Sequence, residues 1–237
     1  MKNAKGRSKD KLNWRDVGVA LRELNGGTEV ITSGWLFRCG NMDYSTKREL
    51  RGSETVINLR QVADLGSQQQ PRAASSSSSA NRNRWMAGED AKEWLHCPVS
   101  KKVDKYDTTL PQVREWLATV MNIFEREDLH FPVLIHCAKG RDRTGVVVAT
   151  LLRILGVPRS LIVQEYLLTS GTHESSILTT LDGIEAASNG GSIEKYFRKK
   201  VNVAKIRRNL SSRVVSSSSS SSCSSSSCFS SCSSSSS

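Results

Sequence analysis

A short apolar run that ends in a charged, glycine-containing loop constrains the fold more than any other part of the chain. Residues 132–135 read Pro-Val-Leu-Ile, and polar residues follow from His136 onward. Such a run is typical of a central strand buried on both faces of a parallel sheet. It is followed by His-Cys-Ala-Lys-Gly-Arg-Asp-Arg-Thr-Gly at residues 136–145, called the cysteine loop below. A helix is expected to begin near Thr144, so the chain is predicted to contain a strand, a tight loop and a helix in direct succession.

Strand-like and helix-like segments alternate in the rest of the sequence. Residues 36–37, 55–59 and 95–99 are short β-prone runs, and residues 45–50 favour a capped helical turn. Apolar side chains recur at spacings of three and four between Val113 and Phe124, which predicts a helix of about 15 residues. Two or three more helices are expected between residues 158 and 210. The alternation predicts an α/β fold, a three-layer domain with a central, mostly parallel sheet flanked by helices on both faces.

Low-complexity segments set the expected domain limits. The chain has 237 residues, of which 37% are hydrophobic, which is enough for one core. Residues 211–237 are almost all serine and are expected to be disordered, because they can bury little against the entropy of ordering. Residues 67–84 form a low-complexity loop insertion, and residues 1–11 form a basic flexible arm. We therefore expect one domain over residues 12–210.

The charge of the chain bears on its partners. The formal net charge is +11, with 34 Lys+Arg against 23 Asp+Glu, which favours phosphorylated substrates and allows peripheral contact with an acidic membrane. Nucleic acid is not expected, since neither zinc-finger spacing nor an aromatic RNA-binding motif occurs. The start shows no signal peptide, and the six cysteines do not form a disulfide pattern. These features predict a soluble protein of the reducing cytoplasm, with no metal and no cofactor.

The cysteine loop combines a nucleophile with groups that can hold an oxyanion. Gly140 lets the loop curl, and backbone N–H groups of the loop and of the first helical turn can point at one spot. Arg143 follows Cys137 by six positions and presents a planar fork to two phosphate oxygens. The same positive field favours the thiolate of Cys137.

Smaller roles follow for the neighbours of the nucleophile. Thr144 can donate its hydroxyl to the sulfur, and His136 is expected to orient the loop. Ala138, Lys139, Gly140, Arg141 and Asp142 then complete the predicted phosphate-binding surface. A buried structural cysteine is the plain alternative, but it does not account for an arginine, a threonine and a glycine at these spacings.

The pattern HCxxGxDRTG resembles the loop of bacterial-type tyrosine phosphatases within the protein tyrosine phosphatase superfamily, some of which act on phosphoinositides as well as phosphoproteins. Further similar segments are N-W-R-D-V-G at 13–18, G-W-L-F-R-C-G-N-M at 34–42, V-I-N-L-R at 56–60, and residues 165–170 and 191–197. Asn58 and Cys39 depart from the pattern, which has aspartate and serine there. The resemblance implies hydrolysis of phosphomonoesters through a phosphocysteine intermediate.

The same resemblance implies a general acid. In the superfamily an aspartate on a mobile loop, about 30 residues before the cysteine, protonates the leaving group. Asp104 and Asp107 both fit that distance. Related enzymes carry a leucine six positions after the acid, and Leu110 stands in that place for Asp104, so Asp104 is favoured.

The substrate stays open between phosphotyrosine or other phosphoproteins and phosphoinositides or inositol phosphates. Lys139 and Arg141 add positive charge around Gly140, as in loops that accept neighbouring phosphates. Alternatively, one of the two cations points to solvent, or Asp142 pairs with one of them. A phosphate-binding pseudophosphatase and a sulfur-transferring enzyme are the other classes considered, and both are disfavoured by the set Cys137, Arg143 and Thr144.

Overall fold

The computed structural model describes residues 13–40, 52–61, 64, 91–188 and 192–211. Its elements in chain order are β1 (Arg15–Asp16), α1 (Val17–Leu24), β2 (Leu36–Cys39), β3 (Thr55–Asn58), β4 (Glu93–His96), α3 (Pro111–Ile123), β5 (Val133–His136), α4 (Asp142–Ile154), α5 (Arg159–Leu167), α6 (Glu174–Ala187), α7 (Ile193–Tyr196) and α8 (Val203–Ser211).

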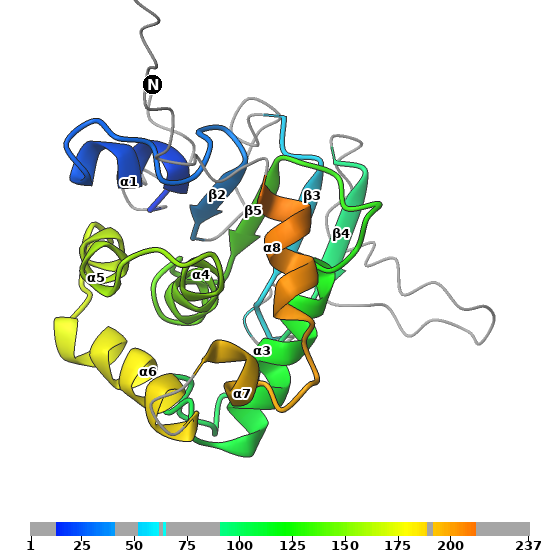
Figure 1. Cartoon of the computed structure of the whole chain (residues 1–237), viewed down its shortest axis with the longest axis vertical. Helices are drawn as coiled ribbons and strands as arrows, with labels where there is room; N and C mark the ends of the chain where they lie inside the picture. The colour runs from blue at the N-terminus through cyan, green and yellow to red at the C-terminus, as the bar shows by residue number, and fades with distance from the viewer. Residues whose placement is uncertain (1–12, 41–51, 62–63, 65–90, 189–191, 212–237) are drawn as a thin grey trace, which may run out of the picture.

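The sheet has five strands in the order β1-β2-β5-β3-β4 (Figure 1). Four of them run parallel, and β1 joins the edge of β2 in the antiparallel direction. In this register Cys39 and Asn58 flank His136, and His96 follows beyond Asn58. The carboxyl ends of the parallel strands therefore meet at one edge, which is where open α/β sheets bind their ligands.

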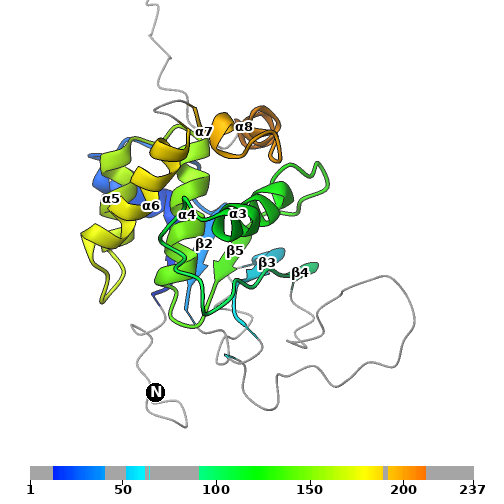
Figure 2. The ribbon, with the colours of Figure 1, turned by 90° about the horizontal axis from the view of Figure 1, so that it is seen from below.

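The helices described here pack together on one face of the sheet, as Figure 2 shows most clearly. Alternate strand residues such as Leu36, Ile57 and Ile135 belong to the same buried cluster as side chains of these helices. The opposite face carries a smaller cluster around Phe37, Val56 and Leu134, against which Trp14 and Trp94 pack. The ring centroids of Trp14 and Phe37 are 5.6 Å apart.

The α/β class and the mostly parallel sheet flanked by helices are confirmed. Helices were expected on both faces; those of the described residues lie on one face, and indole side chains cover part of the other. The buried stripe from Val113 onward does lie on a helix, and α4 begins at Asp142, two residues before the expected start.

Two expectations need correction. The strand expected at residues 95–99 is observed at Glu93–His96, because Cys97 N makes a last bond to Asn58 O and Pro98 then has no N–H to give. Beyond residue 158 the described part contains four helices instead of two or three. The capped turn at 45–50, the arm at 1–11, the insertion at 67–84 and the tail at 212–237 lie outside the described residues.

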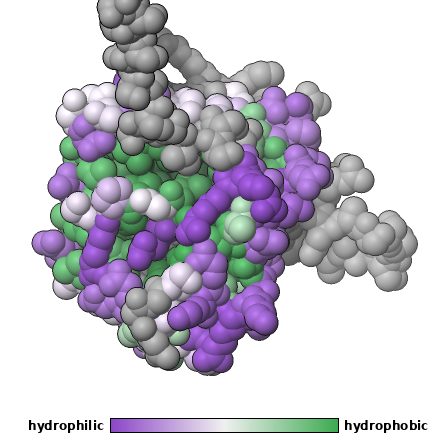
Figure 3. Space-filling view, viewed as in Figure 1, coloured by the Kyte–Doolittle hydropathy of each residue, from purple (hydrophilic) through white to green (hydrophobic). Residues whose placement is uncertain are grey.

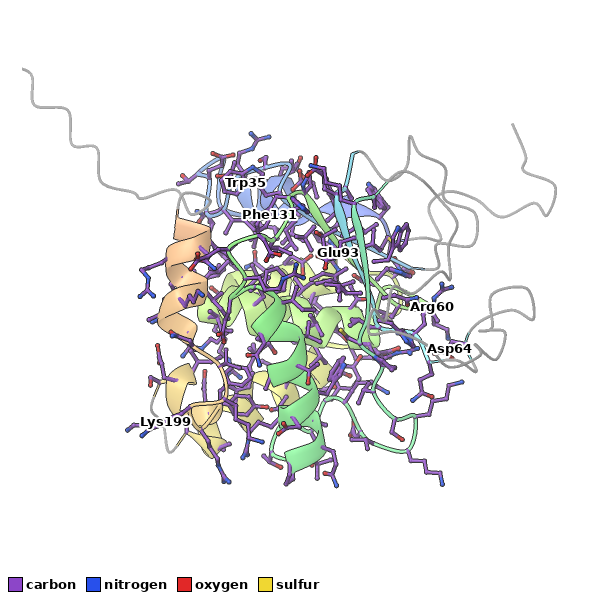
Figure 4. The ribbon with its side chains drawn as sticks, turned by 90° about the vertical axis from the view of Figure 1, so that its right-hand side faces the viewer. Trp35, Arg60, Asp64, Glu93, Phe131 and Lys199 are labelled. Atoms are coloured by element: carbon purple, nitrogen blue, oxygen red, sulfur yellow. The ribbon has the colours of Figure 1, made fainter. Side chains whose placement is uncertain are left out.

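The two ends of the strands lead to different surfaces. On the face that carries α8, apolar residues gather between α1 and α6 (Figure 3). A separate hollow, lined by Ile31, Trp35, Phe131 and Leu210 among others, lies between α8 and the residues that precede β2 and β5. Asp64 and Arg60 lie on the side away from α8 (Figure 4), beyond the carboxyl ends of the strands. None of the helices in the described ranges is long and apolar enough to cross a membrane.

Candidate active site

Cys137 follows the last residue of β5 and lies at the centre of the carboxyl edge of the sheet. The strand is buried along its whole length, and Cys137 itself is buried, with 2% of its surface exposed. His136 is fully buried between Cys39 and Asn58 of the neighbouring strands. Its backbone carbonyl accepts a bond of 2.8 Å from Leu59 N, so the strand end is fixed before the loop begins.

Gly140 brings the cysteine loop into close contact with the end of β2. Its φ is +66°, and a Cβ at this position would lie 2.4–2.5 Å from the backbone of Cys39 and Gly40. A side chain has neither the space nor the favoured backbone conformation here. Glycine at residue 140 thus allows the loop to curl against the neighbouring strand.

Two carbonyl groups of the loop are held from outside. Asn13 Nδ2 donates to Lys139 O at 2.7 Å, and Arg38 Nη2 donates to Gly140 O at 3.0 Å. In a trans peptide the N–H points opposite to the C=O. The N–H groups of Gly140 and Arg141, which share peptide units with these carbonyls, therefore point away from Asn13 and Arg38.

Arg38 belongs to a buried ionic group beneath the loop. Its Nη1 lies 2.7 Å from Glu165 Oε2, and Arg15 Nε lies 2.8 Å from the other oxygen of the same carboxylate. Arg15 also donates to Glu165 O and to Thr169 Oγ1, both at 2.8 Å. Burial and the nearby Arg38 charge lower the pKa of Arg15 to about 10, although Glu165 opposes this. Two guanidinium groups and one carboxylate thus form a rigid support with surplus positive charge.

The first turn of α4 offers backbone donors that have no partner within the helix. No side chain caps this helix end, where Arg141 is the N-cap residue. The first N–H groups of a helix have no partner within it, and the helix dipole favours an anion there. Thr144 Oγ1 is also buried, and the described residues give it no hydrogen-bond partner. A buried polar atom without a partner is costly, so this arrangement suits a bound oxyanion.

Arg143 is oriented by groups at the end of β3. Its Nη1 donates to Leu59 O at 2.9 Å and to Asp64 Oδ2 at 2.7 Å. Asp64 also accepts from Gln61 N and pairs with Lys101 Nζ at 2.8 Å. Burial opposes ionisation of Asp64, but the bonds from Lys101, Arg143 and Gln61 outweigh it and lower its pKa to about 2. With Nη1 held in this way, the rest of the guanidinium fork remains for a ligand.

The two extra cations of the loop differ in their surroundings. Lys139 is exposed, whereas Arg141 donates from Nη1 to Gly171 O at 3.0 Å and from Nε to Asp142 Oδ1 at 3.1 Å. The expectation that Asp142 pairs with one of these cations is therefore met by Arg141. Asp142 accepts a second bond, of 2.7 Å, from Tyr106. Burial opposes ionisation of Asp142, but Tyr106 and Arg141 outweigh it, and its pKa lies below the usual value.

The two candidate acids lie on the segment that joins β4 to α3. Asp104 is exposed, and its Oδ1 accepts from Tyr106 N at 3.0 Å. Asp107 is half-buried and accepts from Thr109 N and Thr109 Oγ1, at 3.1 and 2.5 Å. Asp107 is thus engaged in the turn that leads into α3, while the Asp104 carboxylate faces solvent. The cysteine loop carries Cys137, Arg143 and Thr144 together, but the hydrogen bonds of the two carboxylates do not join either of them to the loop directly.

The chain is similar to known proteins over most of its length. The profile of the tyrosine phosphatase family matches residues 8–189. The chain belongs to the tyrosine phosphatase family.

Two curated phosphatases are similar to part of this sequence. A putative tyrosine-protein phosphatase of Cupriavidus necator is 28% identical over 175 residues, which cover 65% of this chain and 59% of that protein. A triple specificity protein phosphatase, PtpB, of Mycobacterium tuberculosis is 56% identical over 36 residues, or 15% of this chain and 13% of that protein. The chain thus matches about three fifths of the length of the first relative.

Several residues of the candidate site were not predicted from the sequence. Asp64 and Tyr106 carried no role, and Arg15, Arg38 and Glu165 stood only inside similar-looking segments. The available signals were the arginines of the family-like segments at 13–18 and 34–42 and the glutamate that opens the segment at 165–170. The described residues hold no group of three or more metal-ligating side chains that could bind an ion.

Proposed function

We propose that the chain is a cysteine-dependent phosphatase that hydrolyses phosphomonoesters, with phosphotyrosine in proteins as the main substrate. The observation that carries the proposal is the arrangement around Cys137. A buried thiol stands at the start of a loop whose carbonyls are bonded outward to Asn13 and Arg38 and whose helix end is uncapped. This arrangement supports phosphoryl binding, because a phosphoryl group requires N–H donors and a helix dipole near the nucleophile.

The reaction proceeds in two steps. The Cys137 thiolate attacks phosphorus, the P–O bond to the leaving group breaks, and Asp104 gives its proton to the departing oxygen. Water then attacks the phosphocysteine, gives a proton to the Asp104 carboxylate and releases inorganic phosphate, while Thr144 donates its hydroxyl to the departing sulfur. Arg143 binds two phosphoryl oxygens through the part of its fork not held by Asp64 and Leu59.

Asp104 is preferred to Asp107 for a reason that goes beyond sequence spacing. The carboxylate of Asp107 is bonded to both the backbone and the hydroxyl of Thr109, and leaving that turn would disrupt the start of α3. Asp104 is exposed and lies between Lys101 and Tyr106, two residues that contact partners of the cysteine loop. Its carboxylate can therefore reach a substrate without a change in the helix.

The surroundings of Arg141 support a phosphoprotein substrate. A second phosphate next to the scissile one needs free cations, and Arg141 is already bonded to Asp142 and to Gly171 O. Lys139 is the exposed cation of the loop. Phosphoinositides remain the alternative, and a parallel panel of phosphotyrosine peptides and short-chain phosphoinositides ranks the two by kcat/KM.

Turnover of p-nitrophenyl phosphate by the full chain tests the proposal. The Cys137→Ser variant is expected to lose at least about 10³-fold in kcat, because it removes the thiolate. Cys97→Ser is the matched control, because Cys97 is also buried at a strand end but burial raises its pKa to about 11 and leaves it a neutral thiol. A wild-type chain without vanadate-sensitive turnover would favour the pseudophosphatase instead. Turnover that survives in Cys137→Ser would show that Cys137 is not the nucleophile.

A further inference from the structure

The segment that carries Asp104, residues 98–107, touches the cysteine loop through Tyr106. The Tyr106 hydroxyl donates to Asp142 Oδ1 at 2.7 Å and pairs with the Tyr166 hydroxyl at 2.8 Å. Tyr166 in turn packs over the start of α4, since a Cβ at Gly145 would lie 2.5 Å from its ring. One hydroxyl therefore joins the acid-bearing segment to the first turn of α4 and to α5.

A second contact holds the same segment at its other end. Lys101 pairs with Asp64, which is bonded to Arg143. Asp104 lies between Lys101 and Tyr106 in the chain, and its own described hydrogen bond reaches only Tyr106 N. A short stretch fixed at both ends samples fewer conformations than a free loop, so its middle residue is placed with little loss of entropy on binding.

The contact between Tyr106 and Asp142 is the stronger of the two anchors. It is a charge-assisted hydrogen bond between half-buried groups, whereas the Lys101 side chain is 54% exposed and its ion pair is screened by solvent. Burial, together with the bonds to Tyr166 and Asp142, raises the pKa of Tyr106, and the pKa of Asp142 is lowered. The Tyr106 hydroxyl therefore stays protonated and the Asp142 carboxyl stays ionised through the neutral pH range, so the hydrogen bond between them persists.

We propose that Tyr106 is a positioning residue for the phosphatase reaction, which holds Asp104 over the cysteine loop through its hydrogen bond to Asp142. Tyr106 does not touch the phosphoryl group and acts only through the acid. The proposal rests on the proposed function, because it assigns a role within that reaction. It predicts that the hydroxyl matters when the leaving group needs a proton and is dispensable when it does not.

A series of aryl phosphates from 2,4-dinitrophenyl to phenyl phosphate tests this role. In Tyr106→Phe, kcat for phenyl phosphate should fall about tenfold, a part of the 10²–10⁴ that general acid catalysis supplies. For dinitrophenyl phosphate, whose leaving group needs no proton, kcat should change less than about twofold. Tyr166→Phe is the matched control, because it removes the neighbouring hydroxyl and leaves the bond from Tyr106 to Asp142 in place.

A double-mutant cycle with Asp104→Ala separates positioning from a general structural effect. If Tyr106 acts through Asp104, then adding Tyr106→Phe to Asp104→Ala lowers the phenyl phosphate rate no further. The proposal is overturned if Tyr106→Phe still lowers kcat for phenyl phosphate tenfold in the Asp104→Ala variant. It is also overturned if Tyr106→Phe and Tyr166→Phe show the same dependence of kcat on the leaving group. If Tyr106→Phe fails to fold, Asp142→Asn, which weakens the same hydrogen bond from the acceptor side, must show the same leaving-group dependence, about two- to threefold, or the proposal falls. If the wild type shows no turnover that depends on Cys137, the proposed function itself is wrong. If the wild type is active but the loss of kcat in the variants does not depend on the leaving group, only the role of Tyr106 is wrong.

Discussion

At Gly140 the lack of a side chain decides where the cysteine loop can lie. The residue combines a left-handed backbone conformation with an approach of 2.4–2.5 Å, for a hypothetical Cβ, to the backbone of Cys39 and Gly40. Its carbonyl is also the acceptor for Arg38. The position of the anion-binding N–H groups therefore depends on a residue that has no chemistry of its own.

Gly140→Ala tests this dependence. We expect kcat to fall by about 10²-fold or more, because the loop must move by a large fraction of an ångström and misplaced catalytic groups lose rate steeply. Gly26→Ala is the matched control, since Gly26 has a similar φ of +62° but no atom within 4 Å of the added Cβ. That control should cost about 1–2 kcal/mol of stability and leave kcat unchanged. Equal activity in the two variants would show that the close contact with β2 is not needed.

Single residues were predicted from the sequence to very different degrees. Cys137, Arg143, Thr144 and Gly140 lie in one short stretch, where spacing alone indicates a strand, a loop and a helix, and the structure places them so. Asp64 could not be found, because its partner Arg143 is 79 residues away and only the fold brings them together. The roles of these residues stay predictions until the variants are measured.

Among the secondary structure elements, α5 has the least expected role. This helix runs back toward the cysteine loop after α4 and carries Glu165 and Tyr166 on its buried side. Glu165 links it to β1 and β2 through Arg15 and Arg38. The sequence marks this helix only by the family-like segment at residues 165–170, without a role for Glu165, which in the fold holds the support of the loop.

Glu165→Gln measures what that link contributes to stability. The change keeps the shape but leaves two buried guanidinium groups without their carboxylate, so we expect a loss of about 3–5 kcal/mol in the free energy of unfolding. Glu115→Gln removes an exposed carboxylate paired with Lys200 and should change it by less than about 1 kcal/mol. Urea unfolding of both variants gives the comparison. A similar, small loss in both would mean that the buried group adds little net stability.

The elements themselves were largely foreseeable, because each depends on local pattern. The buried strand at residues 133–136 and the helix stripe from Val113 were evident from runs and spacing. The antiparallel strand β1 was missed, since two residues give no periodicity. The start of strand β4 was predicted two residues too late, because apolar residues continue past the last hydrogen bond between β4 and β3.

Across the whole molecule, positive charge gathers beneath the cysteine loop. Arg15 and Arg38 share one carboxylate, and the pKa of Arg15, lowered to about 10 by burial and by Arg38, shows that its charged form is disfavoured in the fold. A basic group with a lowered pKa costs stability at every pH below that value, so the cost is present at neutral pH. We expect an anion bound at the cysteine loop to offset part of this cost.

Inorganic phosphate should therefore raise the melting temperature of the protein. At a concentration 100 times its dissociation constant, a ligand that binds only the folded state adds about 2.7 kcal/mol, or roughly 5–10 °C for a domain of this size. Sodium chloride of equal ionic strength is the reference, and thermal unfolding followed by circular dichroism is the measurement. Arg143→Ala should lose most of the difference. If that variant responds as the wild type does, the gain comes from general salt effects and not from the loop.

The surplus guanidinium charge under the cysteine loop has a practical consequence for handling the protein. We expect dialysis into a buffer without oxyanions to remove a stabilising ligand, so that preparations of the same purity differ in shelf life according to their counter-ions. A tetrahedral anion such as phosphate or tungstate is then a reasonable additive for storage and crystallisation, and its removal belongs at the last step before an assay.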